Sequence, residues 1–521
     1  MRENDDIIHD EMPNRTYRNR DLSLSQEENR MKRTLAYICG LFFILGCAMF
    51  AGCTVGPDYS RPETPADVSE IYIHAGANVQ DVNDFNDVDR WWEQFGDPIT
   101  AQLVQEALRN NYDLKAAAAR VLQTQASLAE VRGLQWPDVS YSISRDRSKR
   151  SFNLGASPFG GGRFSVMSTT WTQGINVNYV LDLFGKLKHS ERAAWADMLA
   201  SEASEQALTN SIIAGVINSR INIATIQRRL SIARANTESR QRTQEIVERR
   251  YSQGLVGPVD TRLARENLAS AKAAEPAVEL SLITAHHALD VLLARPPGSS
   301  ENLPETLEDL PDLEPVPIGV PARLLDRRPD VKAAELALRS ANERIGVSIA
   351  QLYPDLTLTA NYGASADRWR DIWESYSETY GLLMNLAQPI FRGGQIRAQI
   401  DAAEARYAEL AANYAGTVLT AMREVEDALV SEQMLQNQLQ HTDEQFREAK
   451  AAEELSKERY QQGLTGFLVV LETERRRRIA EEQLTILKGQ IWTARVNLFL
   501  ALGGDWDYQQ KEILAVEKNE K

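Results

Sequence analysis

Alternating apolar and polar residues mark four short segments of the chain. Val139, Tyr141 and Ile143 alternate with serines, and the same period of two recurs at three later places. This period puts apolar side chains on one face of a strand and polar side chains on the other. We therefore predict four β-strands, at about 138–149, 168–183, 355–366 and 379–391.

A long proline-free stretch follows each pair of predicted strands. These stretches, 187–253 and 394–462, hold about 67 and about 69 residues. Apolar residues between Ile396 and Tyr414 step by 4, 3, 4, 3 and 4 positions, which is typical of a coiled-coil seam. Helices of that length span roughly 100 Å. A shorter helical pattern follows each of them, at 258–295 and 467–502, so we predict two long helical hairpins.

Nearly the same octet stands at the end of each long stretch: RYSQGLVG at 250–257 and RYQQGLTG at 459–466. Two glycines three residues apart predict a sharp reversal, because glycine tolerates positive φ. The octets belong to a longer internal match. Residues 113–138 align with 330–355 at a shift of 217, and from Gly185 onward the shift is 209. The chain is therefore predicted to be a duplicated domain, with an octet at the tip of each hairpin.

The duplication organises the whole chain. In each half, the helix before the strands and the helix that returns from the octet are each about half as long as the long helix. Stacked end to end, these two shorter helices form one column as long as the long helix. Each half therefore has two columns, and the chain has four. A segment rich in proline and acidic residues joins the halves. The predicted segments are an N-terminal extension with a signal peptide at 1–53, a further N-terminal segment at 54–97, the first repeat at 98–295, the linker at 296–320, the second repeat at 321–506 and a charged tail at 507–521.

The leader combines basic and apolar residues. Lys32-Arg33 precedes LAYICGLFFILGCAMFAGC, which is the order of a secretory signal, and both Met1 and Met31 are possible starts. Small-residue–Cys steps resemble a bacterial lipobox at both Cys47 and Cys53. We favour Cys53, because polar TVGPDY follows it, and predict an N-acyl diglyceride and palmitate there. The alternative is a membrane-spanning anchor, since about 18 apolar residues nearly suffice.

Composition excludes several function classes. The net charge of −15 argues against a nucleic-acid partner. No cysteine follows Cys53, so a disulfide framework is excluded. The six histidines are scattered, and the His286–His287 pair has no helical partner that could share a metal, so we predict no metal site. Without a clustered nucleophile or paired acids, we predict no catalytic residues, no cofactor and no enzyme activity.

Four strands are too few to close a barrel, which needs about eight. Each predicted strand has a continuous apolar face and a small, hydroxylic polar face, as in a membrane barrel with a wet lumen. A sheet with open edges cannot sit in lipid, so oligomers would be needed. A soluble sheet packed on one side is the alternative.

Several motifs resemble one known family. They are WWEQFGDPITAQLVQEALRNNYDLKAAAARV (91–121), LLDRRPDVKAAE (324–335), PDLTLTANYG (354–363), FRGGQI (391–396), the two octets and NLFLALGGDW (497–506). In this order they resemble the TolC-like outer membrane factors, and more closely the lipoprotein OprM/NodT branch that serves RND efflux pumps.

The resemblance implies a mainly α fold with a membrane β-barrel. Three chains would form a twelve-strand outer-membrane barrel and a twelve-helix periplasmic tunnel. Such homotrimers are passive ducts, anchored in outer-membrane lipid, that conduct small molecules from an RND-type inner-membrane transporter through a periplasmic adaptor to the exterior. The alternatives are the duct of a type I secretion system and a lipid-anchored periplasmic coiled-coil adaptor, although an adaptor would have one hairpin and no amphipathic strand pairs.

The resemblance also places a periplasmic gate beside the second octet. Leu468 matches a hydrophobic constriction, Glu472 an acidic ring, and Asp260 a position that pairs near the gate. Converging carboxylates repel one another, which raises their pKa, and they can filter ions by charge. Alternatively, Glu472 is a solvated helix residue, and Asp260 is an acid favoured by the helix dipole. The run Arg475–Arg478 is a solvated helix face or an intersubunit ion-pair strip. The predicted adaptor-contacting tips are Gly254, Leu255, Val256, Gly257, Gly463, Leu464, Thr465 and Gly466.

Overall fold

A computed structural model describes residues 54–63, 73, 91–153, 162–299, 303 and 327–504. Both lipidation candidates, Cys47 and Cys53, lie outside the described residues, as do most of the linker and the tail at 507–521. The chain divides into two compact units, a strand unit and a helical unit. Within the described part of the chain, no helix is both long enough and apolar enough to cross a membrane.

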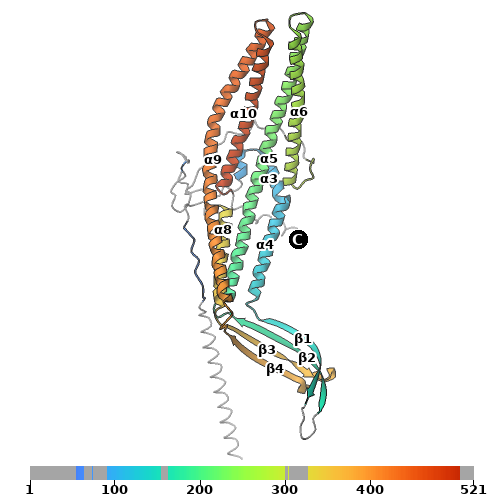
Figure 1. The fold of residues 1–521 in the computed structure, drawn as a ribbon, viewed down its shortest axis with the longest axis vertical. Helices are drawn as coiled ribbons and strands as arrows, with labels where there is room; N and C mark the ends of the chain where they lie inside the picture. Colours follow the sequence, from blue (N-terminus) through green and yellow to red (C-terminus); the bar gives the residue numbers. More distant parts are fainter. Residues whose placement is uncertain are drawn as a thin grey trace, which may run out of the picture. The chain divides into compact units, whose positions relative to one another are not determined.

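The strand unit is one antiparallel sheet in the order β1-β2-β3-β4 (Figure 1). The strands are close to the predicted ones, but β4 is shorter at its end. Pro389 follows closely and has no backbone N–H to donate to a ladder, which explains the early end. The bounds are β1 Asp138–Asn153, β2 Arg163–Leu181, β3 Asp355–Ala366 and β4 Glu378–Ala387.

The strand register pairs apolar residues with apolar residues, and polar or small residues with polar or small ones, across the sheet. Tyr141 is paired with Ile175, Ile175 with Tyr362, and Tyr362 with Tyr380. Because paired residues point to the same face, these four form one apolar row. The neighbouring rows are polar or small, for example Ser140, Asn176, Asn361 and Gly381. One face of the sheet is therefore apolar across all four strands.

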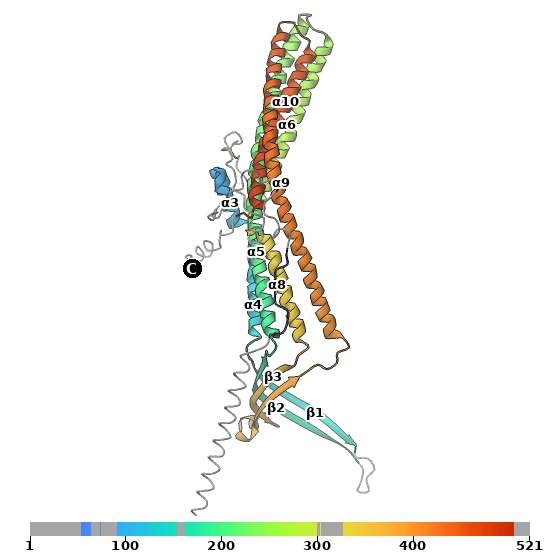
Figure 2. The same cartoon turned by 90° about the vertical axis from the view of Figure 1, so that its left-hand side faces the viewer.

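Two long helical hairpins dominate the helical unit (Figures 1 and 2). The first joins α5 (Lys186–Ser252) to α6 (Pro258–Leu292), and the second joins α9 (Gln395–Gln461) to α10 (Phe467–Ala501). The helices α5 and α9 have 67 residues each. Both views place the two tips side by side at one end of this unit. The predicted hairpins are confirmed.

The helix predicted before the first strand pair is in fact two helices, α3 (Pro98–Asn110) and α4 (Tyr112–Gly133). Asn111 interrupts them with an extended ψ of 132°, and its side-chain oxygen accepts hydrogen bonds from the backbone N–H groups of Asp113 and Leu114. It is thus the N-cap of α4. A single helix was the wrong prediction here, because a capping asparagine offers the backbone another partner.

End-to-end stacking of the shorter helices rests on matching contacts in the two repeats. The amide nitrogen of Asn111 donates to the carbonyl of Leu292 at 2.9 Å, where α6 ends and α4 begins. At the equivalent place, Arg328 donates to the carbonyl of Ala501 at 3.1 Å, where α10 ends and α8 (Pro329–Ala350) begins. Each contact satisfies a C-terminal carbonyl that has no partner within its helix, which confirms the predicted columns.

We expect Asn111→Ala to destabilise the helical unit by about 1–2 kcal/mol, because it removes both the α4 cap and the bond to Leu292. Thermal unfolding followed by circular dichroism measures the effect. The neighbouring Asn110 is exposed, so Asn110→Ala is the matched control. Equal shifts for both variants would contradict the capping role.

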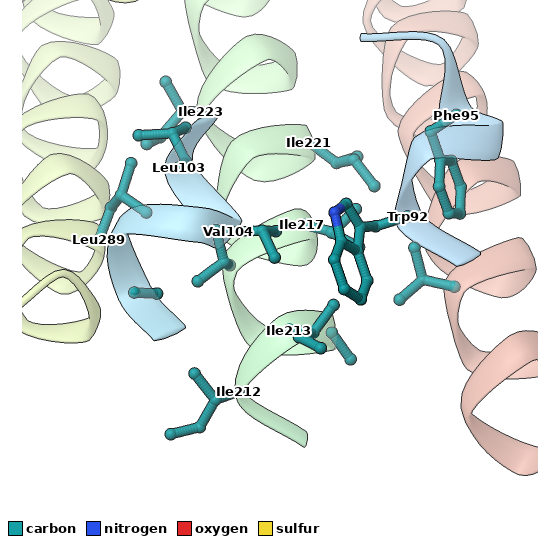
Figure 3. Packing of buried hydrophobic residues seen from close by; sticks show 14 of the residues in the cluster. Trp92, Phe95, Leu103, Val104, Ile212, Ile213, Ile217, Ile221, Ile223 and Leu289 are labelled. Atoms are coloured by element: carbon teal, nitrogen blue, oxygen red, sulfur yellow. The ribbon is translucent and has the colours of Figure 1, made fainter. Parts of the chain in front are cut away.

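The main hydrophobic core lies midway along the hairpins. Trp91 and Trp92 of the short helix η2 (Trp91–Phe95) are each 1% exposed, and Trp91 stacks on Phe499 with ring centroids 5.5 Å apart. Ile213 and Ile217 of α5 lie beside the Trp92 ring (Figure 3). The segment before the first repeat therefore helps to fasten the two hairpins together.

Candidate functional site at the hairpin tips

The two octets form the same turn. Gly254 and Gly463 have φ of 71° and 76°, and the N–H of the next leucine donates to the arginine carbonyl five residues back, at 2.9 Å in the first octet and 2.8 Å in the second. This is a Schellman ending of α5 and α9. A Cβ added at either glycine would meet no neighbouring atom, so the left-handed backbone, not lack of space, requires glycine.

The predicted tip residues are mostly exposed. Leu255 and Leu464 are both 63% exposed, and Gly257 and Gly466 precede α6 and α10 as their N-caps. Val256 and Thr465 are half-buried. The described tips thus present an apolar leucine each, and their second glycines start the returning helices.

A contact that the sequence did not reveal joins the two octets. The Arg250 guanidinium lies 4.7 Å from the ring centroid of Tyr460 and also donates to the Tyr460 carbonyl at 2.8 Å. Burial raises the pKa of the Tyr460 hydroxyl, and Asp260 adds to this while Arg250 opposes it. Asp260, the predicted gate residue of the first hairpin, thus acts electrostatically on a side chain of the second hairpin.

A small apolar cluster also joins the two hairpins beside the octets. Tyr460 and Phe467 from the second hairpin pack with Val247 and Ala264 from the first, and all four are buried. The ring centroids of Tyr460 and Phe467 are 5.7 Å apart. Leu263 and Leu471 pack against the cluster from its edge. Within one chain, the two tips are thus held together by both apolar and polar contacts.

Leu468 and Glu472 lie on one side of a groove of about 400 Å³ between α6 and α10. Leu468 is 65% exposed. Asn267 and Ser270 of α6 line the opposite side, and Arg240 of α5 lines the groove as well. The structure therefore brings the two predicted gate residues of α10 together, whereas Asp260 does not line this groove.

Two arginines of the run after Glu472 hold its carboxylate. Arg475 donates to both carboxylate oxygens at 2.9 Å, and Arg476 donates to one at 2.7 Å. These hydrogen bonds lower the pKa of Glu472 from 4.5 to about 2. Within the chain, the arginines therefore act on this pKa in the direction opposite to the predicted repulsion between carboxylates.

In the duct that the resemblance implies, the lowered pKa of Glu472 predicts how conductance depends on pH. A depressed pKa stabilises the folded state above the ordinary pKa of 4.5, and this stabilisation is lost as the pH falls toward about 2. Conductance should therefore show no step from Glu472 between about pH 4 and pH 7. In the Arg475→Gln, Arg476→Gln variant we expect a step at about pH 4–5, close to the ordinary glutamate pKa, or above it if carboxylates converge.

Planar-bilayer conductance as a function of pH measures this step. Arg423 and Arg447 are exposed α9 arginines, each paired with an aspartate four residues away, so Arg423→Gln, Arg447→Gln is the matched control. A pH profile of the Arg475, Arg476 variant that matches the control would show that these arginines do not set the charge of Glu472.

A partly buried layer of charges joins α9 and α10 near this groove, and sequence reasoning missed it. Glu453 of α9 is 7% exposed and accepts from Lys457 and from Arg477 of α10, both at 2.5 Å. Lys457 also pairs with Glu474 of α10 at 3.1 Å and donates to Ser239 of α5 at 3.3 Å. The layer therefore ties α9 and α10 to each other and to α5. No group of metal-binding side chains occurs among the described residues.

A duplicated chain with two strand pairs, two very long helical hairpins and closely packed tips defines a TolC-like channel subunit. The sequence matches the outer membrane efflux protein family over residues 103–295 and 320–504, and the chain belongs to this family. It is an outer-membrane channel of an efflux system, with a periplasmic extension.

Curated relatives and solved structures agree with the family. The pyoverdine export outer membrane protein OpmQ of Pseudomonas aeruginosa is 30% identical over 466 residues, covering 89% of this chain and 97% of OpmQ. The channel OprN is 30% identical with a TM-score of 0.76, covering 87% of this chain and 100% of OprN. The open state of MtrE from Neisseria gonorrhoeae is 27% identical with a TM-score of 0.75, covering 87% and 98%.

Proposed function

We propose that three copies of this chain form a passive exit duct with twelve β-strands and twelve helical columns. The observation that carries the proposal is the exposed apolar face of the sheet. On β4, Leu382, Met384 and Leu386 are 79%, 66% and 63% exposed. An apolar face of this kind can contact lipid, but the unpaired backbone N–H and C=O groups of the edge strands cannot be satisfied there. Pairing of β1 with β4 of the next copy would close the sheet.

The duct would receive small molecules at the hairpin tips from a periplasmic adaptor and an RND-type inner-membrane transporter. The exposed leucines Leu255 and Leu464 suit contact with an adaptor, since exposed apolar side chains gathered at a tip favour a protein partner. Leu468, Glu472 and Asp260 would form the gate. The groove that Leu468 shares with Glu472 and the effect of Asp260 on Tyr460 support this assignment.

The finer chemical assignments belong to the same proposal. Cys53 would carry the N-acyl diglyceride that anchors the chain in outer-membrane lipid. The duct would need no metal, no other cofactor and no catalysis, because a passive channel forms and breaks no bonds.

Two measurements test the duct. Purified protein should be trimeric by light scattering in detergent and should form discrete channels in planar bilayers. A protein that is soluble without detergent and forms no channels would overturn the proposal. Radiolabelled palmitate should enter the wild-type chain and a Cys47→Ser chain but not a Cys53→Ser chain; label that is lost only from Cys47→Ser would move the anchor to Cys47.

A further inference from the structure

The internal duplication supplies a template for contacts between copies. At the shift of 209, each residue of the first hairpin has an equivalent in the second, for example Arg250 and Arg459 or Tyr251 and Tyr460. Within one chain, the first hairpin contacts the second. In a closed ring of three copies, the second hairpin must then face the first hairpin of the next copy. The inference rests on the proposed trimer and goes beyond it.

The contact within the chain uses only one of each equivalent pair. Tyr460 is 6% exposed and lies under the Arg250 guanidinium. Its equivalent, Tyr251, is 47% exposed, and the equivalent of Arg250, Arg459, is exposed as well. Arg459 and Tyr251 are thus a second set of the same two side chains, each on the side of its hairpin that faces away from the contact already made.

The groove wall repeats in the same way. On α10, Leu468, Leu471, Glu472 and Arg475 face α6 across a groove. Their α6 equivalents line an open groove of about 440 Å³ that no other described helix covers. The equivalents are Val259, Arg262, Leu263 and Glu266, and Pro258 lines the same groove.

Opposite charges face each other at two positions when the contacts within one chain are carried over to the next copy. Leu263 and Leu471 pack on one cluster within the chain, and their equivalents are Glu472 and Arg262. Asn267 and Arg475 line one groove, and their equivalents are Arg476 and Glu266. Both sets become acid facing base, so the surfaces attract each other in the predicted register.

We propose that the open α6 face, formed by Tyr251, Pro258, Val259, Arg262 and Glu266, packs on α9 and α10 of a second copy of this chain. Arg459 of that copy lies over Tyr251, Glu472 meets Arg262, and Arg476 meets Glu266. The tip contacts between copies therefore repeat those within a copy, with charge pairs in place of the Leu263–Leu471 and Asn267–Arg475 pairs. Glu472 becomes a residue shared between the ring of copies and the gate.

Thiol bridging tests the register directly, because the chain has no cysteine after Cys53. The test chain carries Tyr251→Cys and Arg459→Cys, and the matched control carries Arg250→Cys and Tyr460→Cys at the equivalent positions. A short bifunctional thiol reagent is added to the detergent-purified protein. We expect the test chain to run mainly as dimers and trimers on denaturing gels. The control should remain monomeric on gels, with the mass of one internal bridge.

Each outcome decides one question. Chains with either Tyr251→Cys or Arg459→Cys alone should stay monomeric on gels, since neither holds both partners. If the test chain is trimeric by light scattering but stays monomeric on gels while the control gains its bridge, the proposed register is wrong and the duct stands. If the chain is not trimeric by light scattering, the proposed function fails as well.

Discussion

Replacing Leu468 by serine and Glu472 by alanine should make the closed channel leaky, with a severalfold rise in conductance. Leu468 is an exposed apolar side chain beside the tip, and apolar constrictions in channels exclude water and ions. Serine removes that barrier. Alanine at 472 also releases Arg475 and Arg476 from the carboxylate that they share, so their positive charges are free to repel one another.

Single-channel recording in planar bilayers measures the leak. The control pair, Leu280→Ser with Glu279→Ala, changes the same residue types on α6, where both side chains are exposed. Testing the two substitutions separately divides the effect between the apolar barrier and the charges. Unchanged conductance in the Leu468, Glu472 variant would remove both residues from the gate.

The elements that the sequence predicted well depend on regular patterns. The long helices end within a few residues of the predictions, because each ends inside an octet whose glycine requires the left-handed backbone. The third strand has the predicted bounds, since its alternation is uninterrupted. The break at Asn111 was missed because the helical period continues through it, although an asparagine before Tyr-Asp is also a capping signal.

The charged residues at the candidate site show which interactions the sequence could and could not have predicted. Arginines three and four residues after Glu472 can be read from the sequence as its partners, so the direction of its pKa shift was accessible. The resemblance instead directed attention to repulsion between copies. The stacking of Arg250 on Tyr460 was not accessible in this way, because it joins residues 210 positions apart and depends on the packing of two hairpins.

Glu453→Gln should weaken the attachment of the second hairpin to α5 by about 3 kcal/mol, near the lower end for a broken buried ion pair. The substitution leaves Lys457 and Arg477 without the carboxylate that both contact. Without that carboxylate, the Lys457 side chain is held less firmly, which weakens its ion pair with Glu474 and its hydrogen bond to Ser239. Since these contacts tie α9 and α10 to α5 next to the gate groove, their loss should also favour opening.

Amide hydrogen exchange along α9 and α10 near the tip measures the attachment, and conductance measures the opening. Glu454 is the neighbouring exposed acid on α9, and Glu454→Gln should change neither quantity. Faster exchange with unchanged conductance would separate the charge layer from the gate. If neither exchange nor conductance changes in Glu453→Gln, then the apolar cluster around Tyr460 and Phe467 holds the tips without help from these charges.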